Sequence, residues 1–269
     1  MDLKNAFSTN RDTWDKKVAV HEASEFYDVE NFKKGKSSLT PFETHALGDV
    51  KGKKILHLQC HFGQDTMSFQ RMGAKCTGVD ISTEAVKLAR NINKELQLDT
   101  TFLCCNVLDT SSLTSETFDI VFTSYGTIVW LPDLKPWAKM IQERLKPGGV
   151  FYIVDFHPIA WMYDYNVSPP KLKYGYQQKE AIYEEYEGTY ADEKSKIESK
   201  EYSWNHGLGE VVTSLCEAGL SITYLKEHKT SPYDIFPGLI KNKEGLFELN
   251  EGLYPLIFEL KASNPSKDK

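Results

Sequence analysis

The sequence has little that would support a disulfide framework, a metal cluster or a membrane anchor. Its five cysteines are an odd number, and no two of them have C-x-x-C spacing, which is typical of a reducing cytoplasm. Cys60 and His61 are adjacent, but no second pair accompanies them to complete a tetrahedral metal site. No run approaches the roughly 18 apolar residues of a membrane span, and the opening MDLKNAFSTNRDTW lacks the apolar core of a signal peptide. We therefore expect a cytoplasmic protein with no metal site and no membrane partner.

Positive charge is not in excess either. The 269 residues include 32 Lys and Arg against 38 Asp and Glu, which gives a formal net charge of −6. Because binding to a nucleic-acid backbone needs a basic face, this balance argues against a nucleic-acid partner. With 41% hydrophobic and 26% charged residues, the chain has the composition of a globular protein that buries a large core.

Short apolar runs alternate with segments of helical periodicity in the first half of the chain. We predict five strands, near residues 55–58, 75–79, 101–104, 119–122 and 150–154. Helices are predicted between them, near residues 65–72, 83–96 and 134–145. This order predicts an α/β fold with a Rossmann-like, doubly wound, mostly parallel sheet. Ligands bind such a sheet at the carboxyl ends of its strands, so the loops that follow the strands should surround one crevice.

The flanking segments do not follow this alternation. Residues 1–50 have helical stretches without a clear strand, and we expect an N-terminal helical lid. Residues 159–205, rich in tyrosine and charge, should form a β-hairpin inserted after the fifth strand, with a turn near 191–194. Residues 206–262 should add a helix and two strands, completing a seven-stranded sheet through an antiparallel edge strand. We predict a single domain with its ligand-binding core at 51–158.

The first predicted strand leads into a loop that has a single glycine. Residues 55–63 read ILHLQCHFG, which resembles the first motif of class I S-adenosylmethionine-dependent methyltransferases, a hydrophobic–Leu–Asp–Leu strand followed by Gly–Cys–Gly–Thr–Gly. Further marks of that family are GVDIS at 78–82, CCNVLD at 104–109, FDIVFTSYG at 118–126 and LKPGG at 145–149. The resemblance covers about residues 50–158, and 204–222 is similar to the family's late helix and edge strand. The LQCHFGQDT form of the motif looks like that of a bacterial subgroup.

The resemblance implies S-adenosylmethionine as the cofactor and suggests a role for each loop. Asp80, at the tip of the second strand, would accept hydrogen bonds from the ribose hydroxyls. Asn106 would lie near the adenine amine, with Ile81 and Val107 on the two faces of the ring. Ser124 would lie under the methionine arm and the reacting methyl group. Asp80 and Asn106 also have plainer interpretations, as a helix cap and a turn residue.

The first loop departs from the family pattern. His57 stands where relatives often have an acidic residue, and Gln59 and His61 replace two glycines. Gln59 has a donor and an acceptor for the amino-acid end of the cofactor, and His61 can donate to its carboxylate. We expect both to bind the cofactor together with Cys60 and Gly63. The alternative is a degenerated loop that binds nothing. A dinucleotide dehydrogenase would need G-x-G-x-x-G after the first strand, which is absent.

Three residues are candidates for the chemistry of transfer. His157, which follows the fifth strand in VDFHP, is the first candidate for a base, with a structural histidine as the alternative. His21, in the predicted lid, is the second. Tyr125, at the end of the fourth strand, would lie beneath the reacting methyl group. His206 is a weaker candidate that can instead cap the next helix. The sequence TSYG after the fourth strand is not the Asn/Asp-Pro-Pro-Tyr motif of nucleic-acid or protein-glutamine amino-group methylases.

Four aromatic residues are expected to line a substrate pocket or to contact the sulfonium by cation–π interaction, although each is also a candidate for core packing. They are Trp14, Tyr27, Trp130 and Tyr233. We predict an S-adenosylmethionine-dependent methyltransferase that acts on a small-molecule acceptor by in-line displacement. The alternative is a non-catalytic module on the same fold that binds or senses S-adenosylmethionine or S-adenosylhomocysteine.

Overall fold

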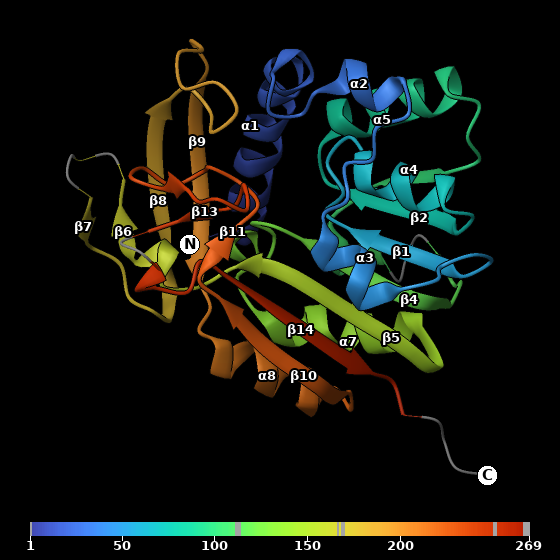
Figure 1. Cartoon of the computed structure of the whole chain (residues 1–269). Helices are drawn as coiled ribbons and strands as arrows, with labels where there is room; N and C mark the ends of the chain where they lie inside the picture. The colour runs from blue at the N-terminus through green and yellow to red at the C-terminus, as the bar shows by residue number, and fades with distance from the viewer. Residues whose placement is uncertain (1, 111–113, 166, 168–169, 250–251, 266–269) are drawn as a thin grey trace.

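The structure is a computed structural model that describes residues 2–110, 114–165, 167, 170–249 and 252–265. Seven strands form the main sheet: β1 (Lys54–Leu58), β2 (Lys75–Asp80), β3 (Thr101–Cys104), β4 (Phe118–Ser124), β5 (Leu145–Phe156), β10 (Ser221–His228) and β14 (Ile257–Ser263). Their order is β10-β14-β5-β4-β1-β2-β3 (Figure 1). Strands β1 to β5 pair in parallel, whereas β14 is antiparallel to both β5 and β10. The predicted doubly wound sheet, with an antiparallel pair at one edge, is confirmed.

Helices cover both faces of this sheet (Figure 1). Those of the alternating core are α4 (Gln64–Arg71), α5 (Thr83–Glu95) and α7 (Leu134–Arg144), and α8 (Leu208–Glu217) follows the hairpin. Alternate residues of β1 point to opposite faces: Leu56 packs in the cluster that contains α7 and α8, and Ile55 packs in the cluster that contains Phe69 of α4. The buried strands thus have apolar side chains on both faces, as parallel sheets require.

Caps explain where the core helices begin. The Ser82 hydroxyl accepts the backbone N–H of Ala85 at 3.0 Å, and the Asp133 carboxylate accepts that of Lys135 at 2.9 Å. Serine and aspartate are preferred at this position because their side-chain oxygens accept the first free N–H groups of a helix. One boundary differs from the prediction: β5 begins at Leu145 instead of residue 150, because Leu145 already pairs with Phe118 before the register shifts to Ile120 opposite Val150.

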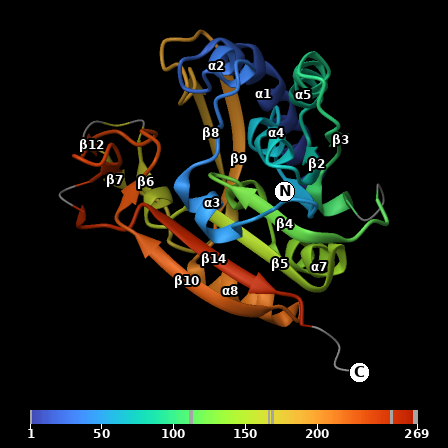
Figure 2. The same cartoon turned by 45° about the vertical axis from the view of Figure 1, so that its right-hand side comes forward.

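The segments before β1 and after β5 add helices and a hairpin to this core. Residues 1–50 form α1 (Leu3–Ala23), α2 (Val29–Lys33) and α3 (Pro41–Leu47), and the predicted hairpin consists of β8 (Gln178–Glu187) and β9 (Glu198–Asn205). Helix α1 runs beside β9 in both views (Figures 1 and 2). Short elements were not predicted: η1 (Val107–Asp109), η2 (Ile128–Trp130), η3 (Ala160–Met162), β6 (Tyr163–Asp164), β7 (Lys171–Leu172), β11 (Thr230–Ser231), β12 (Ile240–Lys241) and β13 (Phe247–Glu248).

None of the helices in the described ranges combines the length and the apolar character needed to cross a bilayer. In the same part of the chain, no three His, Cys, Asp or Glu side chains are grouped so that they could hold a metal ion.

Candidate active site

A cavity of about 710 Å³ lies at the carboxyl ends of the parallel strands, enclosed by loops of the sheet, by α1 and by the β8–β9 hairpin. Every residue that we predicted to contact the cofactor lines it: Gln59, Cys60, His61, Gly63, Asp80, Ile81, Asn106, Val107 and Ser124. The cavity wall also includes Tyr125 and the four predicted substrate residues, Trp14, Tyr27, Trp130 and Tyr233. The predicted side chains are therefore brought together around one space large enough for a small ligand.

The loop after β1 keeps a glycine-type backbone although it has only one glycine. Gln59, His61 and Gly63 have positive φ angles of 53°, 50° and 76°. They occupy the three positions at which the family motif has glycine. A left-handed conformation costs a non-glycine residue about 1–2 kcal/mol, so the surrounding contacts must hold Gln59 and His61 there. Only Gly63 is required for steric reasons, since a Cβ atom on it would lie 2.3 Å from the ring of Phe102.

The side chain of Gln59 connects this loop to the loop after β4. Its Nε2 donates to the carbonyl oxygen of Thr127 at 2.7 Å, while its buried Oε1 has no hydrogen-bond partner among the described residues. The β4 loop is in turn held by Asp155, a buried residue that the sequence analysis missed. Its carboxylate accepts the backbone N–H groups of Gly126, Thr127 (3.0 Å) and Ile128 (3.3 Å).

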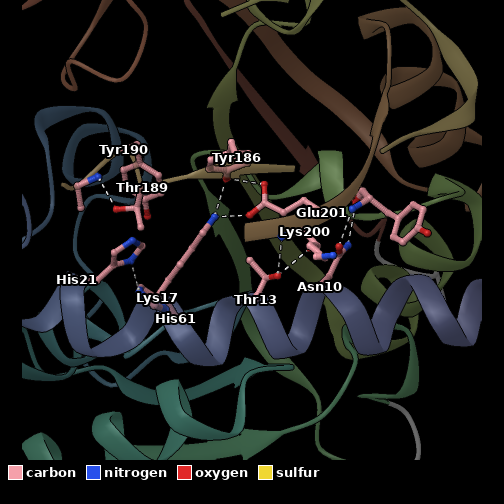
Figure 3. A network of polar contacts seen from close by, with 12 residues as sticks. Asn10, Thr13, Lys17, His21, His61, Tyr186, Thr189, Tyr190, Lys200 and Glu201 are labelled. Atoms are coloured by element: carbon pink, nitrogen blue, oxygen red, sulfur yellow. Dashed lines mark hydrogen bonds and ion pairs between the residues drawn. The ribbon is translucent and has the colours of Figure 1, made fainter. Parts of the chain in front are cut away.

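The side chain of His61 pairs with His21 of α1 (Figure 3). Nδ1 of His21 lies 3.0 Å from Nε2 of His61. Burial lowers the pKa of His21 to about 3 and that of His61 well below its ordinary value, so both imidazoles are neutral at pH 7. Nδ1 of His61 has no partner in the described structure. It is a donor if His21 donates to His61 and an acceptor if His61 donates, so in either tautomer it is available to a ligand.

Asp80 lies at the end of β2 beside this pair. Its two oxygens accept the backbone N–H groups of His61 at 2.7 Å and Ser82 at 2.9 Å. Burial raises the pKa of Asp80 to about 6, against the opposing effect of these hydrogen bonds. Asp15 of α1 accepts the Ser82 hydroxyl at 2.6 Å and the Glu84 N–H at 3.0 Å, so α1 is tied to the start of α5 next to Asp80.

The wall beyond Asp80 combines polar and apolar groups. The side-chain oxygen of Asn106 accepts the Leu108 N–H at 3.0 Å, so Asn106 caps η1 as well as lining the cavity. Val107 is buried beside it. Burial raises the pKa of the Cys60 thiol well above its ordinary value, which leaves it an unreactive apolar contact.

The candidates for the base occupy different positions. His157 is not among the residues that line the cavity. Its Nε2 lies 2.9 Å from the Glu227 carboxylate of β10 and its Nδ1 accepts the Ile159 N–H at 3.2 Å, so both nitrogens are occupied outside the cavity. This position does not support a direct role as base. Likewise, His206 donates from Nε2 to the Leu131 carbonyl oxygen at 2.7 Å. Tyr125 does line the cavity, but burial raises the pKa of its hydroxyl well above the ordinary value.

Side chains of α1 attach this helix to the hairpin, a contact that was not predicted (Figure 3). The amide of Asn10 exchanges two hydrogen bonds of 2.8 Å with the backbone of Tyr202 in β9. The hydroxyl of Thr13 donates to the Lys200 carbonyl oxygen at 2.7 Å and accepts its N–H at 3.2 Å. These side chains satisfy backbone groups of β9 that would otherwise be an open strand edge.

One helical turn further along α1, Lys17 enters the same network. Its ammonium group pairs with the Glu201 carboxylate and donates to the Tyr186 hydroxyl at 2.9 Å. The Tyr186 hydroxyl donates to the other Glu201 oxygen at 2.7 Å. The side chains of Lys17 and Glu201 are only 2% and 11% exposed. The helical spacing of Asn10, Thr13 and Lys17 is visible in the sequence, but their partners lie far along the chain.

Comparisons with known proteins agree with this geometry. The fold is the Rossmann-like fold of S-adenosylmethionine-dependent methyltransferases. Such an enzyme from Mesorhizobium loti superposes with a TM-score of 0.59 over 86% of this chain and 99% of its own, at 19% identity. The glycopeptide N-methyltransferase MtfA, in its complex with S-adenosyl-L-methionine, gives a TM-score of 0.55 over 83% of this chain and 86% of its own, at 16% identity.

The sequence comparisons are more specific. Residues 55–149 match the methyltransferase domain family. The ubiquinone biosynthesis O-methyltransferase of Alkalilimnicola ehrlichii is 25% identical over 164 residues, which are 58% of this chain and 66% of the relative. That of Idiomarina loihiensis is 30% identical over 110 residues, 41% of this chain and 44% of the relative. The chain thus spans less than two thirds of these curated relatives. The segment that matches the domain family includes the loop at 59–63 and Asp80.

Proposed function

We propose that the protein binds S-adenosylmethionine in this cavity and transfers its methyl group to a small-molecule acceptor in the cytoplasm. One observation carries the proposal: the loop at 59–63 has positive φ angles at the three positions where the methyltransferase motif has glycine, and it lies beside the Asp80 carboxylate in one cavity. The match of residues 55–149 to the methyltransferase domain family supports it independently. A degenerated loop would have no reason to hold two non-glycine residues in a costly left-handed conformation.

The residues of the wall fit this cofactor. Asp80 would accept the ribose hydroxyls, and Ile81 and Val107 would pack against the adenine with Asn106 at its edge. At the other end, the buried Oε1 of Gln59 and Nδ1 of His61 have no protein partner in the described structure, and both residues line the cavity. We propose that these two atoms bind the methionine end, because buried polar atoms are rarely left without a partner.

When bound, S-adenosylmethionine supplies a methyl group on a sulfonium, whose departure leaves a neutral thioether. The protein then has to position the acceptor and exclude water. Helix α1 and the hairpin enclose the cavity, and the rings of Trp14 in α1 and Trp130 in η2 are part of its wall, with centroids 5.5 Å apart. His21 and His61 are too weakly basic to be efficient proton acceptors at pH 7. We therefore propose that His61, which lines the cavity, positions the ligand and that His21 holds His61 in place.

Calorimetry with S-adenosylhomocysteine tests cofactor binding. We expect a single site on the unaltered protein, and affinity at least about tenfold lower for Asp80→Ala, because a carboxylate that accepts hydroxyl groups is lost. Asp99→Ala, which changes an exposed carboxylate, is the matched control. No binding at near-millimolar ligand would refute the proposal, and equal affinity of Asp80→Ala and the control would remove Asp80 from the ribose site.

Turnover separates the enzyme from a binding module on the same fold. The protein is incubated with S-adenosylmethionine and a panel of amine, hydroxyl and thiol acceptors, and formation of S-adenosylhomocysteine is measured. Acceptor-dependent product is the expected result. Tight binding of S-adenosylhomocysteine without product from any acceptor would favour the non-catalytic module.

A further inference from the structure

Asp65, in the first turn of α4, is a cavity carboxylate to which the proposed function assigns no role. It lines the cavity, and its oxygens accept the Ser38 hydroxyl at 2.6 Å and the Ser124 hydroxyl at 3.4 Å. Both partners are neutral. Burial raises the pKa of Asp65, and among the described residues only these two hydroxyl groups oppose that effect. A buried carboxylate that only neutral groups contact is costly in free energy, which a cationic ligand would offset.

The lysines in the cavity wall do not supply that cation. Lys17 is paired with Glu201, and Lys36 lies 2.7 Å from the Asp28 carboxylate. Both ammonium groups are thus already neutralised by other acids. In the described part of the cavity wall, Asp65 therefore lacks a cationic partner.

Five aromatic residues line the same cavity, and we call them the aromatic cluster: Phe26, Tyr27, Tyr125, Tyr190 and Tyr233. Tyr233 contacts two of the other rings, with its ring centroid 4.7 Å from that of Tyr125 and 5.5 Å from that of Phe26. Tyr190 completes the wall, 5.3 Å from Phe26 and hydrogen-bonded to the Tyr27 hydroxyl.

The charge of Asp65 acts on this cluster directly. Besides burial, its negative charge raises the pKa of Tyr27 and of Tyr233, which places both phenols within electrostatic range of the carboxylate. The faces of aromatic rings are negative and attract cations, most strongly where water is excluded. One carboxylate and five rings therefore favour a positively charged ligand and disfavour an anion.

We propose that Asp65 and the aromatic cluster form a binding site for an alkylammonium group. The site rests on the proposed function, because it lies in the same cavity, and it adds the charge class of the ligand. The ammonium group has two possible sources. One is the methionine arm of the cofactor, and the other is an amine acceptor.

The first arm of the test compares two cofactor products by calorimetry. S-adenosylhomocysteine has the ammonium group, whereas 5′-methylthioadenosine lacks the whole amino-acid arm. If the methionine ammonium occupies the site, Asp65→Asn should lower the affinity for S-adenosylhomocysteine by about 10- to 100-fold, the range expected for loss of a hydrogen bond to a charged group. Its affinity for 5′-methylthioadenosine should equal that of the unaltered protein, which also shows that the variant is folded. Asp99→Asn is the matched control.

The second arm adds a cationic probe to protein saturated with S-adenosylhomocysteine. Tetramethylammonium and its uncharged near-isostere tert-butanol are titrated while the tryptophan fluorescence is recorded, to which Trp14, Trp130 and Trp161 in the cavity wall contribute. If an amine acceptor occupies the site, tetramethylammonium should bind and tert-butanol should not. This binding should be lost in Asp65→Asn and weakened in Tyr233→Leu, which removes a ring but keeps the carboxylate.

The proposal of an ammonium site is refuted if Asp65→Asn leaves the binding of both S-adenosylhomocysteine and tetramethylammonium unchanged. It is also refuted if Asp65→Asn lowers the affinity for 5′-methylthioadenosine as much as the affinity for S-adenosylhomocysteine. Neither result affects the proposed function, which fails if the unaltered protein does not bind S-adenosylhomocysteine or forms no product with any acceptor.

Discussion

Replacing Lys17 by methionine should destabilise the protein far more than replacing a surface lysine. Methionine has a side chain of similar length but lacks the charge that compensates Glu201. Breaking a buried ion pair by removing one partner costs about 3–5 kcal/mol, and the two side chains are only 2% and 11% exposed. Glu201 keeps its 2.7 Å hydrogen bond from Tyr186. We therefore expect a cost at the lower end of this range, a loss of about 3 kcal/mol in the free energy of unfolding.

Urea denaturation followed by far-ultraviolet circular dichroism measures this loss. The control is Lys135→Met, because Lys135 pairs with Glu217 at 2.9 Å with side-chain exposures of 68% and 53%. An exposed pair contributes at most about 1 kcal/mol. The double variant Lys17→Met/Glu201→Gln has no uncompensated charge, so it should be more stable than Lys17→Met alone. If Lys17→Met costs no more than Lys135→Met, the buried contact between α1 and the hairpin does not exist in solution and the closed cavity is wrong.

Three further predictions concern residues in and around the site. Affinity for S-adenosylhomocysteine should fall about tenfold from pH 7 to pH 5, since Asp80, with a pKa of about 6, is ionised and accepts hydroxyl groups above that pH and is protonated below it. Calorimetry should show the same fall in Glu43→Gln, which removes a second buried acid with a pKa of about 7, and no fall in Asp80→Asn. Gly63→Ala should lower the free energy of unfolding in urea by about 2–4 kcal/mol through left-handed strain and overlap with Phe102; a loss below about 1 kcal/mol would contradict the loop geometry. His157→Gln should cost about 1–3 kcal/mol of stability yet leave the methylation rate within about twofold, because His157 is engaged outside the cavity; a much slower rate at unchanged cofactor affinity would restore its role as base.

The core of the fold was predictable because its signals are local. Alternating apolar runs and helix caps such as Ser82 lie within a few residues of the elements that they define. The strand ends then placed Gly63 and Asp80 at one edge of the sheet by topology alone. Elements of two residues, such as β11 and β12, are too short to have a period, and they were missed.

The lid and the charges in the cavity were not predictable in the same way. Asn10 bonds to Tyr202 across 192 positions of the sequence, and no periodicity links two segments so far apart. Asp65 looked like an ordinary acidic residue in the first turn of a helix, a position favoured by the helix dipole. Its role depends on hydroxyl groups from Ser38 and Ser124, which only tertiary structure brings to it.

The prediction for His157 shows a limit of topology. The residue follows β5 directly, so the rule for strand ends placed it in the crevice. Side chains alternate along a strand, and Asp155 is the residue that reaches the loop after β4. Two positions later, His157 has its backbone N–H bound to the Leu256 carbonyl oxygen and its ring against Glu227 of β10. The conformation of the turn after β5, which the sequence does not reveal, determines which way the His157 side chain points.

The central claim is that the cavity beside Asp80 binds the methyl donor. Titration of the unaltered protein and of Asp80→Ala with S-adenosylhomocysteine in a calorimeter tests it most directly. The predicted result is one binding site on the unaltered protein and an affinity at least about tenfold lower in the variant. Absence of binding to the unaltered protein at near-millimolar ligand would contradict the claim.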